Sequence, residues 1–213
     1  MPMYMIFPLG AGIFWTATYV LIIRAGLRDR TYGMPVVAFA ASIGWEFTFT
    51  FVRPVPGVRA WINLTWFCLD LAIGYTIVRY GRREFPGLPP RLLLPSFIGV
   101  CALAYTAMEL ISRELDHGER HLSAFADNVL ISALFLAMLA ARGPRGQSVG
   151  IAVTKLLGTA CASLAMLTVP EIDPRYDNGL MYFLYFSCLV LDLAYVWAMV
   201  AVRRRTAPAE QPD

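Results

Sequence analysis

Seven long apolar runs, joined by short polar connectors, constrain the fold of this chain more than any other feature. An α-helix rises about 1.5 Å per residue, so about 20 mainly apolar residues cross a hydrocarbon core roughly 30 Å thick. Hydrophobic residues make up 58% of the 213 residues and charged residues only 15%, far from the balance of a soluble domain. The expected spans are residues 3–23, 34–52, 61–78, 92–112, 122–141, 149–169 and 180–202.

These runs predict an all-α, multi-pass protein of the cell membrane, an integral membrane bundle of seven transmembrane helices. The connectors are rich in Gly, Pro and Arg, and none is long enough to hold a soluble domain. We therefore expect a single transmembrane domain over residues 1–205, followed by a short disordered tail at residues 206–213.

The arginines indicate the orientation of the bundle, because cytoplasmic loops retain positive charge. Along a path of seven spans, twelve arginines fall on the side of the C-terminus and five on the other side. We expect the N-terminus outside and the C-terminus in the cytoplasm. The net charge of +3 reflects this topology and does not imply a nucleic-acid partner. The larger group comprises Arg24, Arg28, Arg30, Arg79, Arg82, Arg83, Arg91, Arg142, Arg145, Arg203, Arg204 and Arg205.

Six ionisable side chains lie inside the expected spans, where a charge at the helix centre costs about 2.5 to 3.5 kcal/mol on insertion scales. Five of them are acidic and one is basic, so ion pairing cannot neutralise them all. Some must be protonated, hydrogen-bonded or hydrated, and a protonated carboxylic acid in an apolar pocket is a potential proton donor. The six are Glu46, Asp70, Glu109, Asp127, Lys155 and Asp192.

Depth divides this set into two groups of three. Lys155 lies near an inner end, where its long side chain can snorkel to the interface, so a structural role is expected for it. Glu109 and Asp127 lie near the outer ends, and for both a structural and a functional role remain open. The other three acids lie deep in their spans.

The deep acids share helical faces with polar and aromatic side chains, because residues three, four and seven apart lie on one face. Acids that only join helices by hydrogen bonds are the alternative, but three at similar depth with aromatic neighbours favour a chemical site. The candidate binding residues are Trp45, Asn63, Trp66, Tyr105, Tyr185 and Tyr195.

Carboxylic acids in an aromatic, water-poor cavity suit one kind of chemistry. Protonation of an alkene or an epoxide generates a carbocation, which must be shielded from water and from nucleophiles. Aromatic faces stabilise such a cation by up to about 2 kcal/mol or more when it is desolvated. The chain is 13% aromatic, although many of these rings are expected in the core or at the membrane interface.

Four short segments carry a resemblance to a known family. They are Tyr32-Gly33-Met34-Pro35, Trp45-Glu46-Phe47, the stretch from Trp66 to Asp70, and Asp192 in the last span. Together with the length and the helix count, they resemble the small seven-helix membrane-bound terpene cyclases. Those enzymes act in fungal meroterpenoid and indole diterpene pathways, and bacterial relatives cyclise farnesylated indoles.

The resemblance implies metal-independent, protonation-initiated cyclisation of a farnesyl-type chain on a lipophilic substrate, such as a farnesylated indole or a related meroterpenoid precursor. It implies two essential acids: a glutamate in the second helix, which falls on Glu46, and an aspartate in the last helix, which falls on Asp192 by its Leu-Asp-Leu setting. Asp70 receives a supporting role. No cofactor and no metal are implied.

Two further features bear on this expectation. The chain has no Asp-x-x-Asp or Asn-x-x-x-Asp diphosphate motif, which argues against a magnesium-dependent prenyltransferase. Lys155 is the only lysine beside many arginines, which indicates a GC-rich bacterial gene.

Other functions remain open at this point. A proton-coupled transporter also buries acids at mid-membrane, but usually shows repeated halves and broken helices, and the sequence shows neither. A retinal protein would need a Schiff-base lysine in its last helix, where this chain has Asp192 and no lysine. A non-catalytic membrane scaffold is the remaining alternative.

Overall fold

A computed structural model describes residues 5–169 and 173–206. Within these ranges the regular secondary structure is helical, without β-strands, and seven α-helices confirm the predicted all-α bundle. Six helices are long and apolar enough to cross a membrane, and the second apolar segment, Val36–Val52, is shorter. The helices are α1 (Ile6–Asp29), α2 (Val36–Phe47), α3 (Val58–Glu84), α4 (Pro90–Leu110), α5 (His121–Arg142), α6 (Val149–Thr168) and α7 (Gly179–Thr206).

Local sequence sets several of the helix boundaries. α4 begins with Pro90, whose fixed φ and missing N–H suit the first turn of a helix. The side chain of Ser148 caps α6 by accepting a hydrogen bond from the backbone N–H of Ile151 at 3.1 Å. Two π-helical turns, η2 (Thr48–Val52) after α2 and η3 (Ile111–Leu115) after α4, continue those helices, and a 3₁₀ turn, η4 (Pro174–Tyr176), precedes α7.

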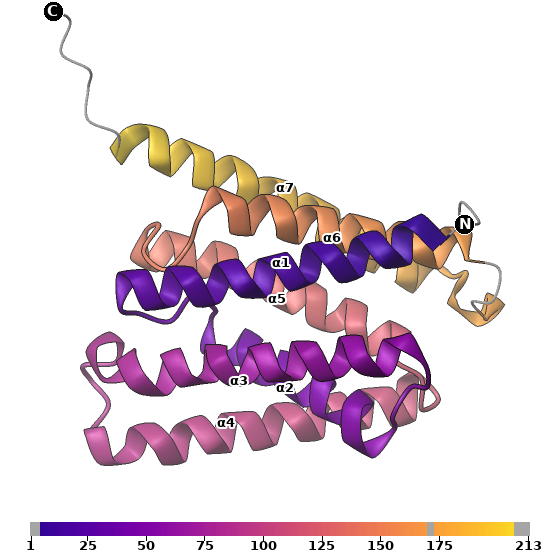
Figure 1. Ribbon diagram of the computed structural model, residues 1–213, viewed down its shortest axis with the longest axis horizontal. Helices are drawn as coiled ribbons and strands as arrows, with labels where there is room; N and C mark the ends of the chain where they lie inside the picture. Colours follow the sequence, from indigo (N-terminus) through magenta and orange to yellow (C-terminus); the bar gives the residue numbers. More distant parts are fainter. Residues whose placement is uncertain (1–4, 170–172, 207–213) are drawn as a thin grey trace, which may run out of the picture.

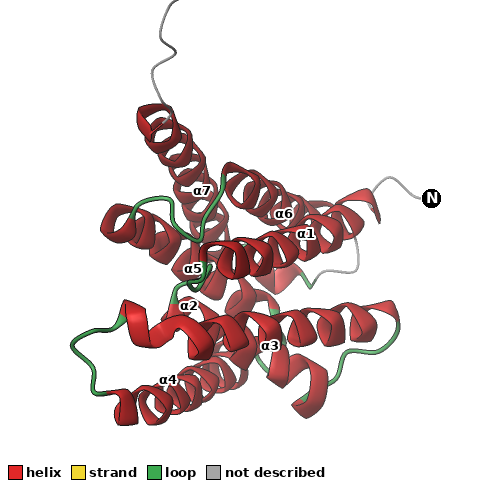
Figure 2. Cartoon of the chain, turned by 60° about the vertical axis from the view of Figure 1, so that its left-hand side comes forward, coloured by secondary structure: helices red, strands yellow, loops and turns green. Residues whose placement is uncertain are grey.

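The helices pack side by side, and α2 contacts α3, α4 and α5 (Figures 1 and 2). α1 packs along α6 and α3, and α7 packs against α5 and α6. Large apolar side chains on the outside of the bundle remain exposed, for example Leu103 of α4 and Trp197 of α7, both 74% exposed. Such a surface is suited to lipid, as expected for a membrane protein.

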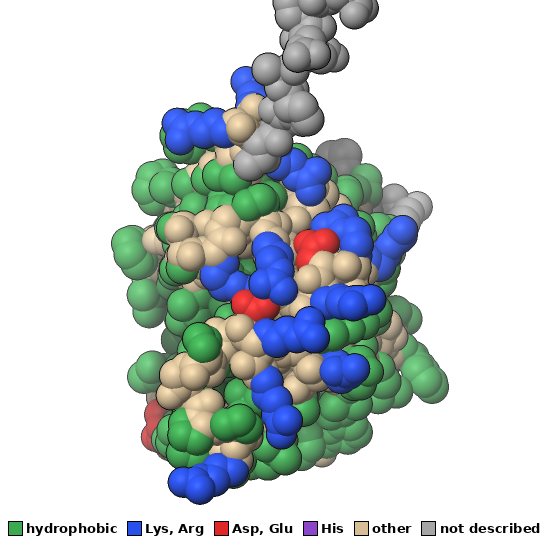
Figure 3. Space-filling model, turned by 90° about the vertical axis from the view of Figure 1, so that its left-hand side faces the viewer, with side chains coloured by type: hydrophobic (Ala, Val, Ile, Leu, Met, Phe, Trp, Pro, Cys, Tyr) green, Lys and Arg blue, Asp and Glu red, His purple; other side chains and the backbone are tan. Residues whose placement is uncertain are grey.

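One end of the bundle is strongly basic (Figure 3). At this end Glu84 forms ion pairs with Arg142 at 3.1 Å and with Arg145 at 3.0 Å, and accepts a hydrogen bond from Thr31 at 2.7 Å. The Arg142 guanidinium lies 4.0 Å from the centroid of the Tyr32 ring. The Tyr32-Gly33-Met34-Pro35 segment, which connects α1 to α2, therefore contacts the ends of α3 and α5.

The expected tail at residues 206–213 lies outside the described residues, apart from Thr206. Thr206 is the last residue of α7, and the tail stays a prediction.

Candidate active site

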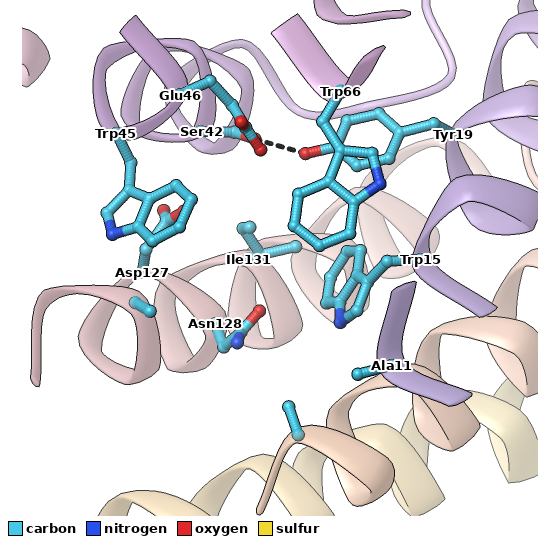
Figure 4. Close-up of a pocket in the computed structure, with 12 residues that line it drawn as sticks. Ala11, Trp15, Tyr19, Ser42, Trp45, Glu46, Trp66, Asp127, Asn128 and Ile131 are labelled. Atoms are coloured by element: carbon cyan, nitrogen blue, oxygen red, sulfur yellow. Dashed lines mark hydrogen bonds between the residues drawn. The ribbon is translucent and has the colours of Figure 1, made fainter. Parts of the chain in front are cut away.

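A cavity of about 140 Å³ lies between five helices in the half of the bundle opposite the basic end (Figure 4). Its wall combines aromatic rings, small residues and two carboxylic acids. The lining residues are Ala11, Trp15 and Tyr19 of α1, Ser42, Trp45 and Glu46 of α2, Trp66 of α3, Ala124, Asp127, Asn128 and Ile131 of α5, and Ala162 of α6.

Glu46 is positioned by an unusual stretch of α2. It lies near the end of this helix, two residues before the π-helical turn Thr48–Val52, a local distortion that is frequent at functional sites. The preceding turn sits tightly against α4, because a Cβ atom on Gly44 would lie 2.9 Å from Tyr105 Cα. The glycine thus permits the close contact that holds this part of α2 in place.

A chain of hydroxyl groups connects the cavity to a third acid, Asp70. The Tyr19 hydroxyl and Ser42 Oγ are 2.9 Å apart, and Ser42 donates a hydrogen bond to Asp70 Oδ2 at 3.1 Å. The carboxyl group of Glu46 lines the same cavity as the Tyr19 hydroxyl. Figure 4 shows Glu46 reaching from α2 towards Tyr19 of α1. A hydrogen-bonded path therefore runs from Tyr19, beside Glu46, through Ser42 to Asp70.

The three acids of this region are buried without a cationic partner. Glu46 is 2% exposed, Asp127 7% and Asp70 0%. None of them forms an ion pair with any described residue. One carboxyl oxygen of each also lacks a hydrogen-bond partner among the described residues. Because an isolated buried carboxylate is costly, such groups are suited to hold protons rather than charge.

Aromatic rings form most of the remaining wall. The Trp66 ring stacks on Tyr19 with centroids 6.3 Å apart, and Trp66 Nε1 donates a hydrogen bond to Thr16 at 2.9 Å. The ring centroids of Trp15 and Tyr19 are 6.1 Å apart on the same side of the cavity, and Trp45 lies on the other side. Ring faces of this kind can stabilise a cation.

The cavity continues into a second chamber of about 190 Å³, with which it shares Trp45, Trp66 and three alanines. The outer part of this chamber includes Arg59 at the start of α3 and Arg120 and His121 at the start of α5. The two chambers together therefore lead from the buried acids to a polar mouth, at the end of the bundle opposite the basic end.

The structure brings together some of the predicted site residues. Glu46, Trp45 and Trp66 line the first chamber and Asn63 lines the second, where it donates a hydrogen bond to the backbone oxygen of Phe49 at 3.1 Å. Asp70 lies behind the wall of the first chamber, where it accepts a hydrogen bond from the wall residue Ser42.

Three predicted binding residues lie elsewhere. Tyr105 lines neither chamber and packs edge-on against Phe47. Tyr195 is fully buried and donates a hydrogen bond to Gln147 at 2.8 Å. Tyr185 lines a different cavity, between α6 and α7. Spacing along one helix could not show which of these rings faces the acids.

Asp192 also lies outside the two chambers. Its Oδ1 contacts Lys155 Nζ at 2.5 Å, with side-chain exposures of 1% and 0%. The expectation that Lys155 snorkels to the interface is therefore wrong, since a buried carboxylate from another helix neutralises it. The predicted essential role of Asp192 stays a prediction.

The two remaining acids have separate outcomes. Glu109 forms an ion pair with Arg53 at 2.5 Å, which gives it a structural partner. Asp127 faces the cavity together with Glu46. Its position near the start of α5 did not reveal this, because depth along a helix says nothing about which neighbours it meets.

Sequence reasoning also missed Trp15 and Tyr19. Both lie in the first span, which contains no deep acid to draw attention to it. Their spacing of four residues on one helical face was the available signal.

Among the described residues, no group of three or more His, Cys, Asp or Glu side chains is arranged to hold a metal ion.

Comparison with known proteins identifies the family. The family model of Pyr4-like transmembrane terpene cyclases matches residues 1–205. The chain belongs to this family. A membrane terpene cyclase is thus an enzyme with a lipophilic substrate, and the transporter and scaffold alternatives lose their support.

Curated relatives agree with this assignment. The chain is 28% identical to the Pyr4-family terpene cyclase mfmH of Annulohypoxylon moriforme, over 92% of this chain and 84% of the relative. It is 28% identical to the terpene cyclase pyr4 of Aspergillus fumigatus, over 92% and 86%, and 30% identical to the terpene cyclase dpmaB of Metarhizium anisopliae, over 94% and 86%. No solved structure matches significantly. These relatives are fungal, so they do not support the expectation of a bacterial source.

Proposed function

We propose that this terpene cyclase starts the cyclisation of a farnesyl-type chain by donating a proton from Glu46, without a metal ion. One observation carries the proposal: Glu46 is buried among aromatic rings, beside Asp127, with no cationic partner among the described residues. A carboxyl group in such a site favours its neutral form, which can act as a general acid.

The hydroxyl path from Tyr19, beside Glu46, to Asp70 supplies a route for a second proton. Tyr19 and Ser42 each carry a hydroxyl that both donates and accepts hydrogen bonds. When Glu46 has protonated the substrate, a proton from Asp70 can reach it by successive transfers through Ser42 and Tyr19. This assigns to Asp70 the supporting role that the sequence predicted.

The reaction balances as an isomerisation. The proton adds to an alkene carbon or to an epoxide oxygen, and the electron pair of the next alkene attacks the resulting cation to form a carbon–carbon bond. The last cation loses a proton through the hydroxyls of Tyr19 and Ser42 to the carboxylate that the relay leaves at Asp70. No proton is consumed, and the mass of the product equals that of the substrate.

Trp15, Trp45 and Trp66 have two tasks in this scheme. Their faces stabilise the successive cations, and their bulk excludes water that would trap a cation as an alcohol. The same walls oblige the flexible prenyl chain to adopt a folded conformation before the first bond forms.

The two chambers also support an orientation for the substrate. The acids lie at the inner end, and Arg59, Arg120 and Asn63 lie towards the mouth. We therefore place the prenyl chain inside and the polar part of a farnesylated indole, or of a related meroterpenoid precursor, near the mouth.

Membranes that contain the protein test the proposal when they are incubated with 3-farnesylindole in the presence of EDTA. Mass spectrometry should detect an isomer of unchanged mass and shifted retention. The Glu46→Gln variant keeps the shape of the side chain but cannot protonate an alkene, so its rate should fall by about 10² to 10⁴.

Glu114→Gln is the matched control, because Glu114 is exposed and lies outside both chambers. Full activity of folded Glu46→Gln would refute Glu46 as the acid. Absence of any isomer, from this substrate and from epoxidised and other prenylated acceptors, would refute the proposed substrate class.

A further inference from the structure

The buried ion pair of Lys155 and Asp192 joins three helices. Lys155 Nζ, on α6, contacts Asp192 Oδ1 of α7 and Ser132 Oγ of α5, each at 2.5 Å. Both charged residues are fully buried. A lone ammonium or a lone carboxylate would be costly at this depth, so each group depends on the other.

Asp192 is badly placed to donate a proton to the substrate. It lines a separate cavity of about 420 Å³ between α6 and α7, whereas Glu46 faces the chamber between α1, α2 and α5. No described hydrogen bond connects Asp192 to the path from Tyr19 through Ser42 to Asp70. A carboxylate that serves as counter-ion to a buried ammonium has no proton to give.

The pair nevertheless reaches the active-site cavity through Trp15. The Lys155 ammonium lies 5.6 Å from the centroid of the Trp15 ring, a cation–π contact. One turn further along α6, Gly158 leaves room for the same ring, since a Cβ atom there would lie 2.8 Å from Trp15 Cδ1. Trp15 in turn lines the cavity beside Tyr19.

We propose that Lys155 and Asp192 are positioning residues that seat Trp15 in the cavity wall, and that Asp192 takes no part in proton transfer. This inference rests on the proposed function. It explains how Asp192 can be essential without being an acid catalyst: its loss leaves the ammonium of Lys155 unpaired inside the bundle and displaces the side chain on which Trp15 rests.

Removal of one partner or of both partners distinguishes the two roles. Asp192→Asn and Lys155→Met each leave one buried charge alone, and each should lower the rate at least about tenfold. The double variant Lys155→Met/Asp192→Leu replaces the pair by apolar side chains of similar size, and it should recover activity to within about threefold of the parent. Recovery without any carboxylate at position 192 is incompatible with an acid role.

The charge-reversed variant Lys155→Asp/Asp192→Lys is a second test, which keeps the pair and also removes the carboxylate from position 192. Folding is monitored by size-exclusion elution and thermal unfolding in detergent. A folded double variant of either kind that forms no product overturns the proposal.

The ratio of fully cyclised products to products with fewer rings provides a readout that overall stability does not affect. If Asp192 acts through Trp15, Asp192→Asn should change this ratio in the parent but not in a Trp15→Phe background. An equal change in both backgrounds overturns the proposal. Activity that survives Glu46→Gln while the double variants recover would contradict the proposed acid and leave the positioning role standing.

Discussion

Tyr19 lies between Glu46, which lines the cavity, and Asp70, which lies behind the cavity wall. Its hydroxyl is 2.9 Å from Ser42 Oγ and faces the same cavity as Glu46, so removal of this one oxygen breaks the proposed path to Asp70. We expect Tyr19→Phe to lower kcat about tenfold, the equivalent of one hydrogen bond of about 1.4 kcal/mol. KM should change little, because the ring remains.

Single-turnover and steady-state rates of Tyr19→Phe locate this effect. A relay that reprotonates Glu46 predicts a larger loss in steady state than in the first turnover. The reverse result would mean that Tyr19 assists the first proton transfer itself.

Trp45 offers a test of cation stabilisation. Its ring lies between the two chambers, where a cation that forms near Glu46 would meet it. Loss of a cation–π contact of about 2 kcal/mol predicts that Trp45→Leu is about 30 times slower than the parent. Trp45→Phe retains an aromatic face and should lose less. Equal rates for the two variants would leave shape, and not the ring face, as the function of Trp45.

At the scale of helices, the approach of α2 to α4 fixes the height of Glu46 in the bundle. Gly44 has no room for a Cβ atom beside Tyr105, whereas Gly99 of α4 has open space around it. Gly44→Ala should therefore destabilise the protein by about 1 to 3 kcal/mol through overpacking, and Gly99→Ala should not. Thermal unfolding in detergent and cyclase rate measure both consequences. A normal melting temperature for Gly44→Ala would show that α4 can move away from α2 without loss of stability.

The helices themselves were predictable, because a long apolar run satisfies its backbone hydrogen bonds in lipid by forming an α-helix. Glu46 and Asp70 were predictable too, since an acid at mid-membrane needs a reason. Lateral neighbours were not: Lys155 and Asp192 are 37 residues apart, and nothing in their helical spacing indicates the ion pair. The same limit explains why Tyr195 was expected at the cavity and Tyr19 was not.

At the scale of the whole molecule, the basic end and the mouth of the cavity lie at opposite ends of the bundle. The ends of α1, α3 and α5 carry Arg28, Arg82 and Arg142, and the mouth lies where the same three helices begin. If positive charge marks the cytoplasmic side, the mouth opens on the outer side of the membrane.

Reporter fusions in a bacterial host test this orientation. A fluorescent protein joined after Asp213 should fluoresce, and alkaline phosphatase at the same position should be inactive, because the basic C-terminal end of α7 is expected in the cytoplasm. Alkaline phosphatase joined after Val169, at the end of α6, should be active. The opposite pattern at both positions would mean that the bundle is inverted, with the mouth of the cavity, Arg59 and Arg120 on the cytoplasmic side. A soluble pathway enzyme could then deliver the prenylated substrate directly to the mouth.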